Sequence, residues 1–308
     1  MANAPFPIQP ELTAIALAYR NPALIADQVL PRVPVGKQEF KYLKHTLAES
    51  FTIPDTKVGR ISRPTQVEFS ATEVADYCVG YGLEDAVPDA DIQNAPPNFD
   101  PLGRAAEGLT DLIALDREQR TAALVFNVNS YTASTNRTQL QTTSQWSHTD
   151  SNPINAMLEG LDSCIMRPNV LILGQAVWAK VRQHAKVVAA IFGPSNAGVV
   201  TREQLAQILE IDAVLVGQGW VNTAKKGQTA SISRLWGKHA AAIYRDNFAS
   251  ATRGTTFGFT AQWGSIESSQ RFDPDIGLRG GTRVRVGEYV KELVTATDLG
   301  YYWQDAVA

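Results

Sequence analysis

Residues 37–72 read KQEFKYLKHTLAESFTIPDTKVGRISRPTQVEFSAT, and this stretch decides the fold. From residue 61 onward apolar and polar side chains alternate, and Phe40 and Tyr42 alternate in the same way near the start of the stretch. Alternation is typical of a β-strand, because successive side chains point to opposite faces. Between the two runs lies IPDTKVG, residues 53–59, whose proline, aspartate and glycine suit a turn. The stretch therefore predicts an extended β-hairpin.

The predicted hairpin is too long to be stable by itself. Arms of about 14 residues, at about 3.3 Å per residue, span about 45 Å, and a two-stranded ribbon is only marginally stable by itself. We therefore expect the hairpin to rest on another molecule.

The hairpin and the segment that follows it carry opposite charges. Within residues 37–68 six basic residues outnumber four acidic ones, a net charge of +2, whereas residues 73–100 hold seven carboxylates and no lysine or arginine, a net charge of −7. Opposite charges would favour head-to-tail contact between copies. One hypothesis is that basic side chains of one subunit contact carboxylates of its neighbour: Lys41, Lys44, Lys57, Arg60 and Arg63 with Glu84, Asp85, Asp89 and Asp91. The alternative is that both segments are merely solvated surfaces.

The first 36 residues are predicted to form an N-terminal arm. Pro10 and Pro22 each stand where the first turn of a helix tolerates proline, and each precedes a short apolar run. Two short amphipathic helices are therefore expected, the second ended by Pro31 and Pro34. Helices this short need a surface on which to lie.

Residues 73–151 are predicted to form a peripheral domain built on one long spine helix, residues 101–127. Asp100 can cap this helix, and Pro101 fits its first position. Apolar residues gather on one side of the helix, whereas Arg117 is assigned to the polar side, so the helix is expected to be half-exposed.

Residues 152–246 are predicted to form an α/β domain in which helices alternate with short buried strands. The expected elements are a helix opened by Asn152 and Pro153, a strand at 169–174, a helix at 175–192, a helix with a Thr201 and Gln204 capping box, a strand at 213–217, and a strand at 239–246 after a loop with Lys225 and Lys226. Residues 247–308 return to alternating strands and are expected to complete the peripheral domain. The fold class is therefore α+β.

The composition limits the functions open to the chain. With 308 residues, of which 44% are hydrophobic and 19% charged, it can bury a large core. A formal charge of −3 and a pI near 5.9 argue against tight nucleic-acid binding, so any contact with DNA should be weak and nonspecific. No stretch approaches the ~18 consecutive apolar residues of a membrane span, and no signal-peptide pattern opens the sequence, so no membrane association is expected.

The sequence lacks the motifs of common enzymes. It contains no G-x-x-x-x-G-K-[ST], no G-x-G-x-x-G after a strand, no G-x-S-x-G and no H-E-x-x-H. Cys164 is interpreted as a small core residue and His184 as a core histidine on the inward face of its helix. Asp89 and Asp91 supply too few oxygen ligands for a calcium ion. We therefore assign no catalytic, cofactor-binding or metal-binding residue and expect a protein that is not an enzyme.

The order of these elements resembles the major capsid protein fold of tailed bacteriophages, the Hong Kong 97 type, which bacterial encapsulin shells share. The resemblance is carried by the arm, the hairpin, the spine-like helix from Pro101, the sequence NVLILGQAVWAKV at 169–181 and the sequence RVRVGEYVKELVTATDLGYYW at 283–303. It covers essentially the whole chain and is a likeness of architecture.

This resemblance implies a structural role. Copies of the chain would form hexamers and pentamers of an icosahedral shell around phage double-stranded DNA, with residues 152–246 as the axial domain and the hairpin overlapping a neighbour. Portal, scaffolding and decoration proteins are the implied further partners. The implied location is the virion, assembled in the host bacterial cytoplasm.

Two alternatives to a phage capsid remain open from the sequence. An encapsulin-like shell would use the same fold to enclose enzyme cargo, and an α/β enzyme with an unrecognised site is more distant. Some relatives of the capsid fold also crosslink a hairpin lysine to an asparagine of a neighbour, for which Lys41, Lys44 and Lys57 would be the candidates.

Overall fold

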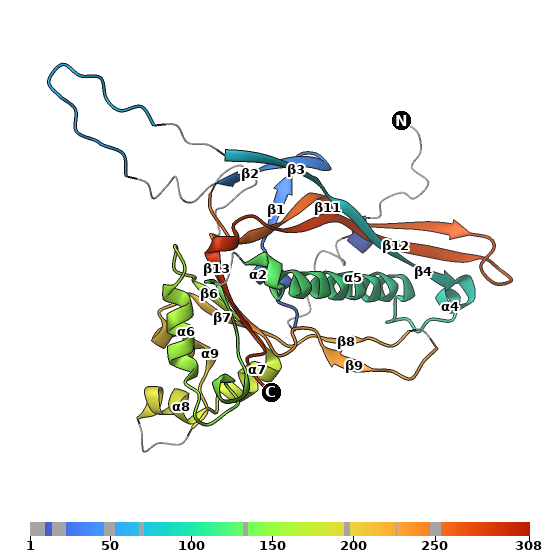
Figure 1. Cartoon of the computed structure of the whole chain (residues 1–308). Coiled ribbons are helices and arrows are strands. Elements are labelled where there is room, and N and C mark those ends of the chain that lie inside the picture. The colour runs from blue at the N-terminus through green and yellow to red at the C-terminus, as the bar shows by residue number, and fades with distance from the viewer. Residues whose placement is uncertain are drawn as a thin grey trace.

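The computed structural model of the chain describes residues 10–13, 23–45, 53–67, 71–131, 135–193, 198–225, 227–246 and 254–308. Two sheets with their helices make up the body, and two thin β-ribbons project from it (Figure 1). This mixture of helices and sheets confirms the predicted α+β class. No helix in the described ranges is long and apolar enough to cross a lipid bilayer.

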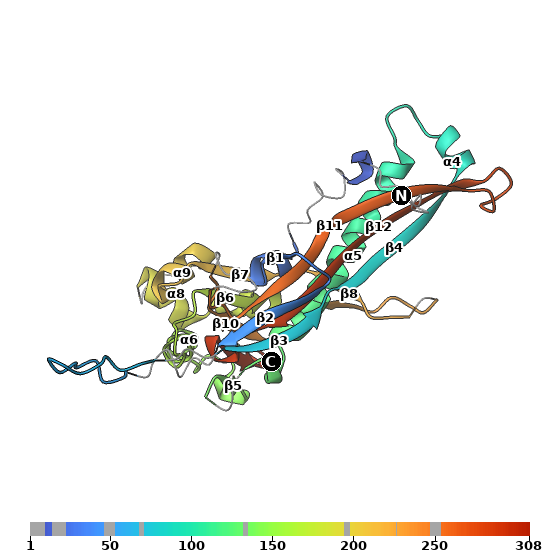
Figure 2. The ribbon, with the colours of Figure 1, turned by 90° about the horizontal axis from the view of Figure 1, so that it is seen from above.

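The peripheral sheet has four strands in the order β1-β11-β12-β4. Their bounds are Arg32–Val35 for β1, Gly258–Asp273 for β11, Gly281–Val294 for β12 and Val79–Pro88 for β4. β1 runs parallel to β11, and the other neighbours are antiparallel. Helix α5, Pro101–Val125, lies along one face of this sheet (Figures 1 and 2). Leu109 and Ile113 of α5 share a buried cluster with Val284 and Val286 of β12.

The start of α5 confirms the predicted cap. The Asp100 side chain accepts a hydrogen bond from the Leu102 amide at 3.0 Å, and Pro101 occupies the first helical turn. The helix ends at Val125, two residues before the expected end at 127. A proline lacks the amide hydrogen that would be unpaired at this position in any case, which is why the local sequence predicts the start so well.

The axial sheet is mixed and has five strands in the order β5-β13-β10-β6-β7. Their bounds are Arg137–Gln139, Gly300–Gln304, Ala240–Ile243, Val170–Gly174 and Ala213–Gly217, in that order. The helices of this region are α6 (Pro153–Asp162), α7 (Gln175–Val181), α8 (Ala185–Phe192) and α9 (Arg202–Leu209). The predicted Asn152 cap of α6 and the Thr201 and Gln204 capping box of α9 are both present. β6 is buried along its whole length.

The prediction of a single helix at 175–192 is wrong in one respect. The structure has two helices there, α7 and α8, and His184 lies between them. His184 has an extended backbone, and its Nδ1 accepts a hydrogen bond from the Lys186 amide at 3.3 Å, so this histidine caps α8. Its Nε2 lies 3.0 Å from the His148 carbonyl oxygen and 3.3 Å from the Ser151 hydroxyl. Both nitrogens of the buried His184 ring therefore have hydrogen-bond partners, as expected for a core histidine.

The C-terminal strands were expected to complete the peripheral domain, and this prediction holds for β11 and β12 but is wrong for β13. β13 lies between β5 and β10 in the axial sheet. Tyr302 and Trp303 point to opposite faces of β13, and both are almost fully buried. A strand with two apolar faces is stable only inside a covered sheet, which the axial sheet provides.

The extended hairpin is present, but its second arm lies further along the chain than predicted. β2 (Glu39–His45) pairs antiparallel with β3 (Ala71–Tyr77). The part of the predicted second arm that is described, residues 61–67, forms no strand and is exposed. Phe40 is buried with Cys78 against β11, so the base of the hairpin is anchored on the body by apolar contact. Alternation alone did not identify the strand, because a strand also needs a partner of matching register.

The described parts of the arm contact both sheets. They are a helical turn at 10–13, helix α2 at Ala26–Val29, and β1, whereas the rest of the first predicted arm helix lies outside the described residues. β1 is a strand of the peripheral sheet, and Val29 of α2 shares a buried cluster with Val125 of α5 and Ile172 of β6. The Thr13 hydroxyl donates to the Ser268 carbonyl oxygen of β11 at 3.2 Å. The remaining short elements are α4 (Asp89–Gln93), β8 (Trp220–Asn222), β9 (Ile232–Arg234) and 3-10 turns at Val128–Ser130, Thr142–Ser144 and Thr297–Leu299.

Candidate assembly surfaces

The tip of the hairpin, residues 53–67, is the first candidate surface. Figure 1 shows it standing away from the rest of the molecule, and every residue in it is exposed. Ile53 and Ile61 are 90% and 96% exposed. Two local hydrogen bonds shape turns within the loop: the Asp55 side chain accepts from the Lys57 amide at 2.9 Å, and the Ser62 amide donates to the Gly59 carbonyl at 3.1 Å. Such a tip presents apolar surface that nothing in its own described chain covers.

Three of the five predicted basic contact residues lie on this exposed tip. They are Lys57, Arg60 and Arg63. Lys41 lies instead on β2, where its ammonium forms an ion pair with Glu73 of β3 at 2.6 Å. Lys44 lies on β2 opposite Thr72, and its side chain is outside the described set. The tip residues are therefore the cations of this set that the fold presents together.

Glu84, one of the four predicted acidic contacts, is held within its own chain. Its carboxylate accepts from the Arg285 guanidinium at 2.7 Å and from the Arg283 guanidinium at 2.9 Å. The hydrogen bond from Arg285 has the largest effect and, together with that from Arg283, lowers the pKa of Glu84 against the opposing effect of desolvation. Val284 and Val286 face α5, so the two arginines and Glu84 lie on the opposite face of the sheet.

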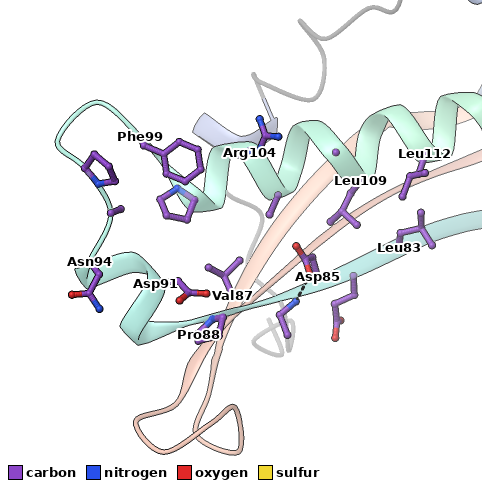
Figure 3. Close-up of a pocket in the computed structure, with 17 residues that line it drawn as sticks. Leu83, Asp85, Val87, Pro88, Asp91, Asn94, Phe99, Arg104, Leu109 and Leu112 are labelled. Atoms are coloured by element: carbon purple, nitrogen blue, oxygen red, sulfur yellow. Dashed lines mark hydrogen bonds between the residues drawn. The ribbon is translucent and has the colours of Figure 1, made fainter.

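A groove between β4, α4 and α5 is the second candidate surface, and Figure 3 shows its lining. Its volume is about 920 Å³. Leu83, Phe99 and Leu112 are exposed in its walls, and Asp85 and Asp91 bring two carboxylates into the same lining. β4 is also an edge strand of the peripheral sheet. The groove thus combines apolar surface, negative charge and an open strand edge.

The structure brings together only part of the predicted acidic set. Asp85 and Asp91 both line the groove, whereas the carboxylate of Glu84, a residue that also borders the groove, is held by Arg283 and Arg285 on the far face of the sheet. Asp89 stands in the first turn of α4, where it accepts a hydrogen bond from the Gln93 side chain at 2.5 Å. Two of the four carboxylates are therefore placed beside exposed apolar side chains.

Sequence reasoning missed a buried polar junction where the arm, the spine helix and the axial domain meet. Glu118 of α5 is fully buried, and its carboxylate accepts from the amides of Ile25 at 2.9 Å and Ala26 at 2.7 Å. It also accepts from the indole nitrogen of Trp236 at 2.6 Å. The amides belong to the start of α2, so a side chain of one helix caps another. Burial raises the pKa of Glu118 although all three donors favour the carboxylate.

Arg117 completes this junction, which corrects its predicted place on the exposed side of α5. It is 2% exposed and forms an ion pair with Asp27 of α2. Its guanidinium also donates to the Thr260 hydroxyl of β11 at 3.2 Å. A helical period cannot reveal this burial, because the polar side of α5 is covered by the arm, which is distant in sequence.

The residues considered for chemistry occupy structural positions. Cys78 and Cys164 are both buried and unbonded, and burial raises the pKa of Cys164 to about 11, far from that of a reactive thiolate. Among the residues that the structure describes, no cluster of three or more His, Cys, Asp and Glu side chains could hold a metal ion. The exposed hairpin tip and the groove between β4, α4 and α5 are therefore the candidate sites for contact with other molecules.

The same arrangement occurs in solved structures. The structure matches a phage-related protein from Bordetella bronchiseptica RB50 with a TM-score of 0.76 at 22% identity, over 97% of both chains. It matches the capsid of Cyanophage P-SCSP1u with a TM-score of 0.62 at 13% identity, over 93% of this chain and 89% of that one. An arm, a projecting hairpin, a spine helix on a long sheet and an axial α/β region together define the Hong Kong 97 type of capsid fold.

Comparison with known sequences shows to which family within this class of fold the chain belongs. No protein-family model matches the chain. A major capsid protein of Pseudomonas phage JBD67 is 55% identical over 309 residues, which covers all of both chains. The chain therefore belongs to the family of phage major capsid proteins. It is a structural component of the virion, it builds the capsid with copies of itself, and the encapsulin alternative is not favoured.

Proposed function

We propose that copies of this chain form the hexamers and pentamers of an icosahedral shell that encloses phage double-stranded DNA. The observation that carries the proposal is the hairpin tip at 53–67, which presents both basic and apolar side chains and has no cover from its own described chain. In this proposal the arm is 1–36, the hairpin loop 37–72, the peripheral domain 73–151 with 247–308, and the axial domain 152–246, except that the strands β5 and β13 of the peripheral ranges join the axial sheet.

The proposed contact places the hairpin of one subunit on the acidic segment of its neighbour. Of the two predicted sets, Lys57, Arg60 and Arg63 on the tip meet Asp85 and Asp91 in the groove. Lys41 and Glu84 are already paired within their own chain, with Glu73 and with Arg283 and Arg285. Exposed ion pairs contribute only about 0–1 kcal/mol each, so charge sets the register more than the affinity. Burial of exposed apolar side chains supplies the larger part, at about 1.5–3 kcal/mol for an isoleucine.

Reversal of charge at the tip tests this contact. In the Arg60→Glu/Arg63→Glu variant, like charges would meet the acidic segment, so we expect loss of shells in negative-stain micrographs and of fast-sedimenting material. Circular dichroism should show that the subunit still folds, because both side chains are exposed and far from the core. The Arg60→Lys/Arg63→Lys variant keeps the charge and serves as the matched control. Shells of normal yield from the charge-reversed variant would remove the contact from the proposal.

The proposed role extends to partners and location. Portal, scaffolding and decoration proteins join the shell, and contact with the packaged DNA is weak and nonspecific, in keeping with a net charge of −3. Assembly takes place in the cytoplasm of the host bacterium, and the protein catalyses no reaction. Mass spectrometry of purified particles would test the partner set, and nuclease treatment of opened particles would test whether their content is DNA.

A further inference from the structure

The second projecting ribbon, β8–β9, is a paired two-stranded hairpin with one exposed apolar face. Trp220 pairs with Arg234 and Asn222 pairs with Ile232, so these four side chains lie on the same face. The Asn222 side-chain oxygen accepts from the Ala224 amide at 3.1 Å and the Ser231 amide at 3.0 Å, which closes the end of the two strands. The ribbon therefore holds a defined shape.

This face of the ribbon is apolar and solvent-exposed. Trp220 is 50% exposed and Ile232 is 58% exposed. The Arg234 guanidinium lies 4.2 Å from the centroid of the Trp220 ring, which arranges a cation over the indole. Figures 1 and 2 show the ribbon projecting away from the body in both views. An isolated two-stranded ribbon gains little stability from its own contacts, so an exposed apolar face on it is typical of a docking surface.

The charge of the ribbon is opposite to that of the rest of the chain. Residues 220–234, the ribbon with its loop, contain Lys225, Lys226 and Arg234 and no carboxylate, a net charge of +3. Since the whole chain carries −3, subtracting +3 leaves −6 for all other residues. Charge complementarity therefore favours a second copy of this chain as the partner.

We propose that the β8–β9 ribbon is a second self-association surface, which packs the face with Trp220, Ile232 and Arg234 against an acidic and apolar surface of another subunit. The inference rests on the proposed assembly of the shell, but it uses an element separate from the hairpin at 37–72. A DNA backbone would satisfy the lysines but would leave Trp220 and Ile232 without an apolar partner, which is why a protein partner is favoured.

The distribution of tryptophans provides a direct test. Of the six tryptophans, Trp146, Trp178, Trp236 and Trp303 are buried, and only Trp220 and Trp263 are exposed, at 50% and 36%. In a Trp263→Phe variant the fluorescence that acrylamide can quench comes mainly from Trp220. We expect this quenchable component to be lost when purified subunits assemble into shells. Retention of the component in shells would overturn the inference, as would its loss only after duplex DNA is added.

A second experiment separates this inference from the proposed function. The Trp220→Ser/Ile232→Ser variant removes the apolar face without touching the core, and we expect a several-fold fall in shell yield while monomer circular dichroism is unchanged. The matched control is Thr229→Ser on the same loop. Wild-type protein that never assembles would refute the proposed function. Wild-type protein that assembles together with a variant that assembles equally well would refute the ribbon inference alone.

Discussion

Removal of the Glu118 carboxylate should destabilise the subunit more than most substitutions on α5. Glu118 accepts hydrogen bonds from the amides of Ile25 and Ala26 and from the indole of Trp236, all within a fully buried site. Glu118→Ala would leave these three donors without a partner. Each unsatisfied buried donor costs about 1–3 kcal/mol.

The net loss is smaller than the sum of those three costs. Burial raises the pKa of Glu118, so the wild-type protein already carries the cost of holding a desolvated charge, and the alanine variant is relieved of it. We therefore expect a loss of about 3–5 kcal/mol in the free energy of unfolding, a large part of the about 5–15 kcal/mol of a typical domain. Glu118→Gln keeps one carbonyl acceptor and should lose about 1–3 kcal/mol.

Urea unfolding of unassembled subunits, followed by circular dichroism, measures these losses. The pH dependence gives a sharper comparison with Glu118→Gln. The pKa of Glu118 in the folded protein is raised above 4.5, its ordinary value in the unfolded chain. Between the unfolded pKa and the folded pKa the native state therefore binds more protons than the unfolded state, and stability falls as pH rises through that window. Wild type should therefore gain stability relative to Glu118→Gln as pH falls toward 4.5. A loss below about 1 kcal/mol for Glu118→Ala would refute the view that this carboxylate joins the three elements.

Two further predictions concern the core and the arm. A Cβ on Gly217 would lie 2.0 Å from Cδ1 of the buried Trp236 ring, so Gly217→Ala should lower the free energy of unfolding by about 1–3 kcal/mol or more and lower the thermal midpoint with it. Gly108→Ala on α5, where a Cβ meets nothing within 4 Å, should be neutral or stabilising in the same thermal scan. Although burial opposes it, Arg117 and Arg32 hold the pKa of Asp27 below 3.8, so its contribution is present above that pH and is lost as pH falls through the folded pKa. Stability of the wild type and of Asp27→Asn, compared by urea titration, should therefore converge in acid, and a constant difference would contradict this.

Features set by neighbouring residues could be predicted from the sequence. The caps at Asp100 and Asn152 and the capping box of Thr201 and Gln204 each require only residues within one turn of the helix. The buried strand β7 was also placed at its observed bounds, because a short apolar run between a helix and glycine has few other uses. These local signals were sufficient to place the starts of α5, α6 and α9 and the strand β7, whereas α7 and α8 were predicted as one helix.

Features set by residues distant in sequence could not be predicted in this way. Alternation at 61–67 did not lead to a strand, because the partner of β2 is β3, and register depends on both strands. β13 joins the axial sheet because its two apolar faces need cover that only the three-dimensional arrangement supplies. Arg117 and Glu118 are polar residues on a helix that reads as half-exposed, and only the arm packed over them explains their burial. For the same reason the sequence predicted the acidic contact residues only as a run of charges along the chain. It did not predict the groove in which Asp85 and Asp91 lie together.

The distribution of charge over projecting and compact parts of the subunit constrains how copies can meet. The hairpin tip at 53–67 and the β8–β9 ribbon are basic, whereas Glu84 and Asp85 lie on β4 and Asp89 and Asp91 lie on α4. A two-fold contact that pairs like patches would bring two basic ribbons together and would be disfavoured electrostatically. A head-to-tail contact instead sets the ribbon of one subunit on the acidic surface of the next, and it repeats in one direction until the ring closes. Rings of this kind are the capsomers that the proposed shell needs, so under the proposed contact the charge asymmetry that would favour association would also favour this geometry.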